Sequence, residues 1–285
     1  MSYLNRREFS LTALAGAAGA LVAAPKLNST FHGVTIGVQS YSFRDRPLDP
    51  AIEAMKEIGF GECELYSGHV EPKGLKGEDL RKWRLETPLD HFREVGKKFR
   101  EAGIDLYAYN YSFRDDFTDP EIERGFEMAR AMGAKCITAS SNVDISPRVD
   151  TYAQKYKMRV GFHNHSNMRP NEFARPSDWA TAMKGRSKYI AINLDIGHFT
   201  AAGFDAVQFL EEHHADILTL HIKDRKKNQG PNVPLGQGDT PIKEVLAVLR
   251  DKRYKIPANI EYEYKGGDTI EEVRRCFEYC RNALA

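Results

Sequence analysis

The sequence has few cysteines and no excess of charge of either sign. Its four cysteines form no Cys-x-x-Cys pair, which argues against a disulfide framework and against a zinc knuckle. Lysine and arginine total 41 against 40 aspartate and glutamate residues, so a broad basic face for nucleic acid is not expected. These absences favour a protein whose partner is a small molecule.

Long apolar runs are missing near the start of the chain. The apolar stretch at residues 12–24 consists mainly of small residues and is too short to be a stable membrane anchor. It follows Arg6, Arg7 and Phe9, and paired arginines before a phenylalanine resemble a twin-arginine export signal. We therefore predict that residues 1–30 are a leader or disordered N-terminus, and that the mature protein is periplasmic and free of the membrane. The alternative is a frayed amphipathic N-terminus.

A GxGxxG turn, which would mark a dinucleotide-binding sheet, is absent as well. From residue 33 on, short β-rich runs alternate with segments of helical periodicity. The predicted strands cover residues 34–42, 62–66, 104–109, 135–139, 159–163, 189–195, 217–221 and 257–261. The predicted helices cover residues 49–58, 89–102, 119–132, 149–156, 204–214, 242–250 and 269–282, and one more starts at Ser177.

Eight strands that are each followed by a helix predict one α/β domain, a (β/α)8 TIM barrel over residues 31–285, rather than an open doubly wound sheet. Asp49 and Asp119 each precede a proline and are predicted to cap their helices, which Gly59 and Gly133 are predicted to end. Two glycine-containing stretches are expected to be loops: 67–88 and 230–238.

The functional residues are expected where the barrel strands end. In such a barrel the catalytic groups lie at the carboxyl ends of the strands, where residues two apart point the same way. Five predicted strands end in side chains that bind metals or move protons: Glu64, His163 with His165, Asp195, His221 with Lys223, and Glu261 with Glu263. Buried carboxylates and imidazoles need a compensating charge, which a divalent cation would supply. We therefore predict a metal site at this rim.

Each of these residues also has a purely structural interpretation. Asp195 could cap the turn that follows it, with His198 as an ordinary surface residue. The others could form salt bridges or a polar strand end: Glu261 with Lys265, Glu64 with a lysine of the next loop, and His163 with His165. Their occurrence on successive strands favours one common site over these separate interpretations.

Three motifs resemble those of a known family. Asp195-Ile-Gly-His198, His221-Ile-Lys-Asp224 and Ile260-Glu-Tyr-Glu263, in this order and at these intervals, are similar to motifs of the xylose-isomerase-like TIM barrel superfamily. That superfamily includes sugar and sugar phosphate isomerases and epimerases, inosose dehydratase and, more distantly, endonuclease IV. The resemblance covers residues 33–285. It implies that Asp195, His221 and Glu261 bind a divalent metal, with His198 near the substrate.

The resemblance also suggests which metal is bound and shows one departure from the family pattern. Manganese is usual in the ketose 3-epimerase branch, so Mn²⁺ is expected first, with Zn²⁺, Fe²⁺, Co²⁺ or Mg²⁺ as alternatives. The fourth ligand there is a glutamate that also removes a proton, whereas this sequence has His163, which can still bind such metals. The predicted metal ligands are His163, Asp195, His221 and Glu261. The predicted proton-transfer groups are Glu64, His163 and Glu261, and the predicted substrate-binding residues are His165, His198 and Lys223.

The expected activity is isomerisation or epimerisation of a free sugar or keto-sugar, by proton removal next to a carbonyl and a metal-stabilised enediolate. A lyase or hydratase acting on a 3-keto-glycoside or an inosose is the alternative, because the usual strand-end glutamate is missing. An endonuclease IV-like DNA repair enzyme and a non-catalytic sugar-binding barrel are further alternatives. Assembly as a homodimer or homotetramer is left open. Five aromatic residues are candidates for a sugar-stacking wall: Tyr41, Phe43, Tyr107, Tyr109 and Trp179.

Overall fold

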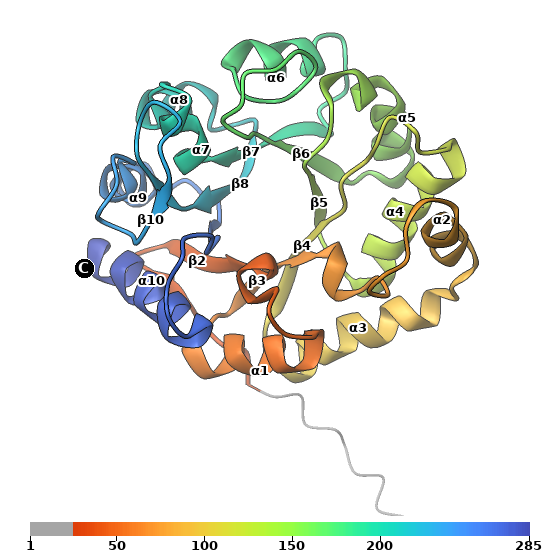
Figure 1. Cartoon of the computed structure of the whole chain (residues 1–285), viewed down its shortest axis with the longest axis horizontal. Helices are drawn as coiled ribbons and strands as arrows, with labels where there is room; N and C mark the ends of the chain where they lie inside the picture. Colours follow the sequence, from red (N-terminus) through yellow and green to blue (C-terminus); the bar gives the residue numbers. More distant parts are fainter. Residues whose placement is uncertain (1–24) are drawn as a thin grey trace, which may run out of the picture.

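Eight parallel strands form a closed barrel that helices surround on the outside (Figure 1). The structure is a computed structural model and describes residues 25–285. The barrel strands are β2 (Val34–Gln39), β3 (Glu62–Tyr66), β4 (Asp105–Asn110), β5 (Cys136–Ala139), β6 (Arg159–His163), β7 (Ile190–Asp195), β8 (Ile217–Ile222) and β11 (Ala258–Ile260). Strand β2 closes the ring because it pairs in parallel with both β3 and β11. The predicted single-domain (β/α)8 barrel is confirmed.

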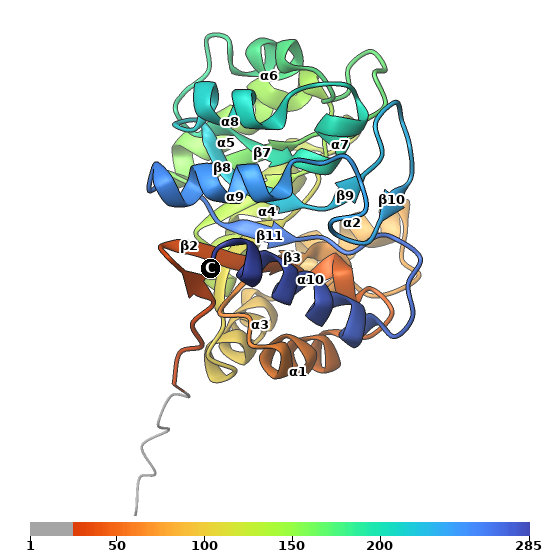
Figure 2. The ribbon, with the colours of Figure 1, turned by 90° about the vertical axis from the view of Figure 1, so that its left-hand side faces the viewer.

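The helices pack around the barrel, as the side view also shows (Figure 2). They are α1 (Leu48–Ile58), α2 (Gly77–Glu86), α3 (Leu89–Glu101), α4 (Asp119–Met132), α5 (Ser146–Tyr156), α6 (Pro176–Met183), α7 (Ile196–Ala201), α8 (Ala206–His213), α9 (Ile242–Asp251) and α10 (Thr269–Ala283). Gly59 and Gly133 end α1 and α4 in the left-handed conformation, as predicted, with φ of 102° and 84°.

The two predicted helix caps are wrong by one or two residues. Pro47 occupies the N-cap position of α1, and Asp49 lies inside the first turn. Thr118 caps α4, where its side chain accepts a hydrogen bond from Glu121 N. The first four N–H groups of a helix have no partner within the helix, so a proline is tolerated beyond the first position. A proline therefore marks the first turn without marking its first residue.

Five elements lie outside the predicted pattern. Strand β1 (Thr30–Phe31) runs antiparallel to β2, β9 (Asp224–Arg225) pairs with β10 (Asn232–Val233), and helices α2 and α7 stand in stretches expected to be turns or loops. None of the residues of α2 is buried, so it has no apolar stripe to detect. Ion pairs of Arg81 and Arg84 with Glu121, at 2.7 and 3.0 Å, attach it to α4 instead.

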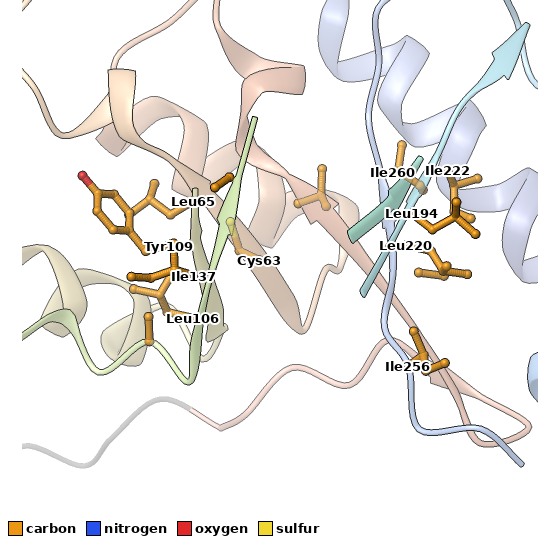
Figure 3. Packing of buried hydrophobic residues seen from close by; sticks show 14 of the residues in the cluster. Cys63, Leu65, Leu106, Tyr109, Ile137, Leu194, Leu220, Ile222, Ile256 and Ile260 are labelled. Carbon is orange, nitrogen blue, oxygen red and sulfur yellow. The ribbon is translucent and has the colours of Figure 1, made fainter. Parts of the chain in front are cut away.

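The main apolar core lies between the outer face of the barrel and the helices. Figure 3 shows part of it, including Cys63, Leu65, Leu106, Leu194, Leu220 and Ile222. The inner face differs, because hydrogen bonds join polar side chains of six strands across the barrel: Gln39, Glu64, Thr138, Asn193, His221 and Asn259. These polar side chains lie directly below the carboxyl-terminal rim, where the site was predicted.

The segment before β2 packs against the amino-terminal end of the barrel. Leu27 N donates to Gly103 O over 2.8 Å, and Gly61 N donates to Ser29 Oγ over 3.0 Å. A Cβ at Gly61 would collide with the carbonyl oxygen of Leu27, so glycine permits this close approach. Residues 25–30 therefore belong to the packed structure, although the sequence analysis assigned them to the leader.

The twin-arginine-like motif and most of the predicted leader fall on residues 1–24, outside the described residues. Within residues 25–285, no helix is both long and apolar enough to cross a membrane.

Candidate metal centre

The four predicted ligand residues meet at the carboxyl-terminal end of the barrel. His163 ends β6, Asp195 ends β7, His221 lies next to the end of β8, and Glu261 follows β11. Each offers one ligand atom, and all four atoms lie within 4.8 Å of one another. Ligand atoms about 2.0–2.2 Å from one ion are at most about 4.4 Å apart, so small side-chain movements would bring all four to a common ion.

Asp195 uses its two carboxylate oxygens differently. Oδ1 accepts a hydrogen bond of 2.7 Å from His198 N and caps α7, so the capping interpretation holds for one oxygen. Oδ2 is buried without a hydrogen-bond partner and lies 3.4 Å from His163 Nε2. Burial raises the pKa of Asp195, but the basic groups of His198 and Lys223 outweigh it and hold that pKa well below its ordinary value. Oδ2 is thus an ionised oxygen that a cation would complete.

His163 stands where a glutamate was expected, and its ring is oriented for metal binding. Nδ1 lies 3.3 Å from Ser140 Oγ, whereas Nε2 is buried and has no hydrogen-bond partner. Metal-binding histidines usually donate their other ring N–H to such a neighbour. With the proton on Nδ1, the lone pair of Nε2 is free to bind an ion.

Glu64 lies behind His221 rather than in the cavity. Its Oε1 accepts hydrogen bonds from His221 Nε2 at 2.9 Å, Thr138 Oγ1 at 2.6 Å and Gln39 Nε2 at 2.8 Å. The predicted proton-transfer role of Glu64 does not fit this position, because the carboxylate is fully buried and does not line the cavity. Its contact instead directs His221 Nδ1 towards Glu261 Oε2, 3.1 Å away.

The charge on His221 follows from its two acidic neighbours. Burial lowers the pKa of His221, but Glu64 and Glu261 outweigh this and raise that pKa well above its ordinary value. In the absence of a metal the ring is therefore an imidazolium held between two carboxylates. An ion bound at Nδ1 would replace one of its protons, so metal binding at this centre is expected to release a proton.

Lys223 places a buried ammonium group among the carboxylates. Nζ lies 2.7 Å from Glu261 Oε2 and 3.1 Å from Asp195 Oδ2, and it also contacts Glu263. Burial lowers the pKa of Lys223, but the three carboxylates raise it above its ordinary value, so the group stays charged. Lys223 thus neutralises part of the negative charge of the site and lines the cavity above it.

The surroundings of His198 include Arg225, which the sequence analysis did not single out. Arg225 Nη1 lies 2.7 Å from His198 Nδ1, and Lys223 Nζ lies 3.2 Å from His198 Nε2. Both cations can only donate. Burial lowers the pKa of His198 well below its ordinary value, so the ring is a neutral imidazole held between two cationic donors at the edge of the cavity.

A cavity of about 400 Å³ opens above the centre. Its lining includes the predicted substrate-binding residues His165, His198 and Lys223, together with groups from the opposite side of the barrel: Tyr41, Tyr66, Asn110, Ser112 and Arg114. Burial is the main reason that the pKa of His165 falls to about 4, so this ring is neutral at pH 7. Three of the four ligand residues, His163, His221 and Glu261, line the same cavity, so neutral imidazoles and polar or charged side chains surround the centre.

Only one residue of the predicted aromatic wall reaches this cavity, namely Tyr41. Phe43, Tyr109 and Trp179 are buried in the apolar core, and Tyr107 lines a different cavity at the amino-terminal end. The sequence pattern could not separate these roles, because aromatic residues serve the core and the cavity equally well.

The residues at the centre fit a divalent cation. Two buried atoms, Asp195 Oδ2 and His163 Nε2, lie 3.4 Å apart, and only the ammonium group of Lys223 partners the first of them. A set of two imidazoles and two carboxylates suits manganese, iron and zinc. The ring of His221 is held by Glu64, as metal-binding histidines usually are.

Comparison with known families agrees with this architecture. The family described as Xylose isomerase-like TIM barrel matches residues 52–282 of the chain. The chain belongs to this family. A search of curated proteins gave no match.

Solved structures share the fold of this xylose isomerase-like barrel at low sequence identity. A 3-keto-D-glucoside 4-epimerase from E. coli is 16% identical, with 87% of this chain and 99% of that chain covered and a TM-score of 0.66. A probable 3-DHS dehydratase from Bacillus anthracis is 17% identical, with 86% and 98% covered and a TM-score of 0.63. The IolI protein, solved with a zinc atom, is 16% identical, with 88% and 98% covered and a TM-score of 0.68.

Two residues of the barrel's site were missed in the sequence, although each had a detectable signal. Arg225 continues the alternation of His221 and Lys223, in which every second residue points inward. Ser140 directly follows the predicted strand at 135–139, and its Oγ lies 3.3 Å from His163 Nδ1. Extending the period of two past each strand end would have found both.

Proposed function

We propose that the protein is a metal-dependent enzyme that removes a proton next to the carbonyl group of a free sugar or keto-sugar and returns it, as an isomerase or epimerase does. The observation that carries this proposal is the convergence of four ligand atoms within 4.8 Å of one another beneath a polar cavity, with His163 Nε2 buried and without a partner. The epimerase among the similar structures supports the same class of reaction.

His163, Asp195, His221 and Glu261 would hold the ion, and Mn²⁺ is the first candidate. A bound divalent cation would supply Lewis-acid charge beside the substrate carbonyl. The zinc atom in a similar structure supports a metal-binding role for this fold. His221 and Glu261 would then be fixed as ligands, which leaves the proton transfer to other groups of the cavity.

His165 is the best placed of these groups to take the proton. Its ring is neutral and lines the cavity, and its ring nitrogens have no hydrogen-bond partner within residues 25–285. The ammonium group of Lys223, with His198 beside it, would donate to substrate oxygens, as preorganised donors do when negative charge develops. This assignment gives His165 a catalytic role beyond the substrate contact predicted from the sequence.

A lyase or hydratase acting on a 3-keto-glycoside or an inosose is the second candidate. It is favoured by His163, which replaces the glutamate of the epimerase pattern, and by the dehydratase among the similar structures. Incubation with candidate keto-sugars in D₂O separates the two. Deuterium in a recovered sugar of unchanged skeleton supports the isomerase or epimerase, and loss of water or aglycone supports the lyase. If no added metal gives deuterium exchange or loss of water or aglycone, the result would count against both candidate activities.

The twin-arginine-like motif favours a periplasmic enzyme and hence a substrate without phosphate. The balance of 41 basic and 40 acidic residues speaks against a DNA repair endonuclease, and nicking of an abasic-site duplex would revive that alternative. A sugar-binding barrel without catalysis has no need of a stoichiometric metal.

The decisive experiment combines metal analysis with His163→Ala. We expect about one divalent ion per chain, and a loss of metal affinity of roughly tenfold or more in the variant, because a ligand is removed. His91→Ala is the matched control, since His91 is an exposed residue of α3, and it should bind metal like the parent protein. Equal metal affinity in both variants would refute the assignment of His163.

A further inference from the structure

A second buried polar cluster lies inside the barrel below the metal centre, where Glu62 of β3 meets Asn259 of β11. Both carboxylate oxygens of Glu62 and Oδ1 of Asn259 are buried and have no hydrogen-bond partner among residues 25–285. Gly37 of β2 makes room for them, because a Cβ there would collide with Asn259 Oδ1 and lie 2.8 Å from Glu62 Oε2. Two buried acceptor groups that share this space without a donor are costly.

The orientation of the Asn259 amide follows from its other neighbours. Nδ2 donates to Thr219 Oγ1 over 2.9 Å and to Glu64 Oε2 over 3.3 Å. Thr219 gives its own hydroxyl proton to the carbonyl oxygen of Pro257, 3.2 Å away, and the carboxylate of Glu64 can only accept. Reversing the amide would place Oδ1 against two acceptors. Oδ1 therefore stays directed towards Glu62.

We propose that Glu62 carries a proton, donates it in a hydrogen bond to Asn259 Oδ1, and through this bond positions the histidine of the metal centre. The proton turns one of the two acceptors into a donor. Asn259 then holds Glu64 Oε2, Glu64 Oε1 holds His221 Nε2, and His221 Nδ1 faces Glu261. Glu62 is thus a positioning residue that acts through Asn259 and Glu64.

The surroundings of Glu62 favour the neutral acid. The residue is 3% exposed, and burial, with the charges of Glu64 and Asp105 in addition, raises the pKa of Glu62 well above its ordinary value. Lys135 and the side-chain contact with Asn259 act in the opposite direction, but the side chain of Lys135 is 56% exposed and its ammonium group pairs with Asp105. The ammonium group of Lys135 is therefore already paired with another carboxylate.

A cavity of about 540 Å³ at the amino-terminal end of the barrel reaches Glu62. It gives the carboxyl group a path for proton exchange with solvent. A metal cation in place of the proton is disfavoured there, because three lysines line the same cavity: Lys26, Lys135 and Lys255. The three lysines thus distinguish the surroundings of this carboxyl group from those of the metal-binding carboxylates at the opposite end of the barrel.

The first test compares the parent protein with Glu62→Gln, whose amide can donate to Asn259 Oδ1 but cannot ionise. A group whose pKa is raised by folding gives stability that is complete below the unfolded pKa, near 4.3, and is lost as pH rises towards the folded pKa. The unfolding equilibrium constant of the parent should therefore rise by about tenfold per pH unit relative to Glu62→Gln between these two pKa values. The infrared carbonyl band of a protonated carboxylic acid should be present in the parent and absent from the variant. Parallel pH curves and no such band would overturn the proposal.

The second test measures positioning with Mn²⁺ and Zn²⁺ alone, by calorimetry on the full chain. Glu62→Leu removes the donor to Asn259 and should weaken metal binding about tenfold, as the loss of an orienting partner does, whereas Glu62→Gln should restore it. Leu218→Ala is the matched control, because Leu218 also faces the barrel interior but lies outside the hydrogen-bonded chain. Equal affinity in Glu62→Leu and Leu218→Ala would refute positioning. If neither the parent nor any variant binds metal, the proposed function and the positioning role both fail. The first test still decides whether Glu62 carries a proton.

Discussion

Hydrogen-bonding atoms at the barrel mouth fall into two groups according to their partners. Glu64 Oε1 accepts three hydrogen bonds from side chains of three other strands, so it orients its neighbours and has no capacity for a ligand. His163 Nε2 is equally buried and has no hydrogen bond, and Asp195 Oδ2 is held only by its ion pair with Lys223, at 3.1 Å. Since burial without a partner is costly, the second group is the one that a ligand would complete.

Glu64→Gln tests the orienting group. The amide can no longer accept every bond that the carboxylate accepts, and it loses the charge that holds His221 in place. We expect the affinity for Mn²⁺ to fall by about 10-fold to 100-fold, as is usual for the partner of a metal-binding histidine. Thr138→Val is the control, because it removes only one of the bonds to Glu64 and should have a smaller effect. Unchanged affinity in Glu64→Gln would contradict this role.

Lys223→Met tests the buried ammonium group. Its removal leaves Asp195 and Glu261 without their nearest cation, and breaking a buried ion pair in this way costs about 3–5 kcal/mol. The metal-free variant should therefore unfold at a lower urea concentration, and added Mn²⁺ should stabilise it more than it stabilises the parent. Lys226→Met serves as the control, since Lys226 is a partly exposed lysine that pairs with Asp239. A stability loss no larger than that of the control would argue against a structural role for the ammonium group.

At the scale of elements, the structure shows which segments a sequence pattern can reveal. Strands β7 and β8 are buried along their whole length, so their apolar runs predicted them. Helix α7 begins after its capping residue Asp195, whose Oδ1 accepts a hydrogen bond from His198 N. The sequence analysis noted this capping residue but interpreted the residues after it as a turn. Helix α2 has no buried residue, and no apolar periodicity could have predicted it.

Arg84→Ala tests how α2 is held. The guanidinium group lies 5.1 Å from the ring centre of Tyr111 and 4.8 Å from that of Phe117, and it pairs with Glu71 and Glu121. Its removal should cost about 3 kcal/mol, because two partly buried carboxylates lose a partner. It should also speed proteolysis and amide exchange within α2.

Arg93→Ala is the control for this change, because Arg93 is 57% exposed and pairs only with Asp90 within α3. It should leave both the stability and the exchange of α2 unchanged. Protection of α2 amides that is equal in Arg84→Ala and in the parent would show that the helix is held by other contacts.

At the scale of the whole molecule, the sequence predicts the position of each site residue around the ring of strands. It does not predict how deeply the side chain lies in the barrel or which neighbour it contacts. Strand order places His163, Asp195, His221 and Glu261 on successive barrel strands. A period of two also places Glu64 on the inner face, yet it does not show that His221 lies between Glu64 and the cavity. That relation depends on contacts between strands far apart in the chain, and no local pattern encodes them.

The boundary of the folded unit depends on such contacts as well, and a shortened chain tests it. Ser29 is 2% exposed, its Oγ accepts from Gly61 N, and its carbonyl oxygen accepts from Ile36 N over 2.9 Å. A chain that begins at residue 32 loses these bonds, the one from Leu27 to Gly103, all of β1 and the packing of Phe31 on Phe277. The three named hydrogen bonds, at about 0.5–1.5 kcal/mol each, alone predict a loss of roughly 3 kcal/mol, and the total loss should be larger. A chain that begins at residue 25 keeps them all and should match the full-length protein in urea unfolding. If both shortened chains unfold at the same urea concentration, the segment at 25–31 contributes nothing to the barrel, and the fold begins where the sequence pattern alone had placed it.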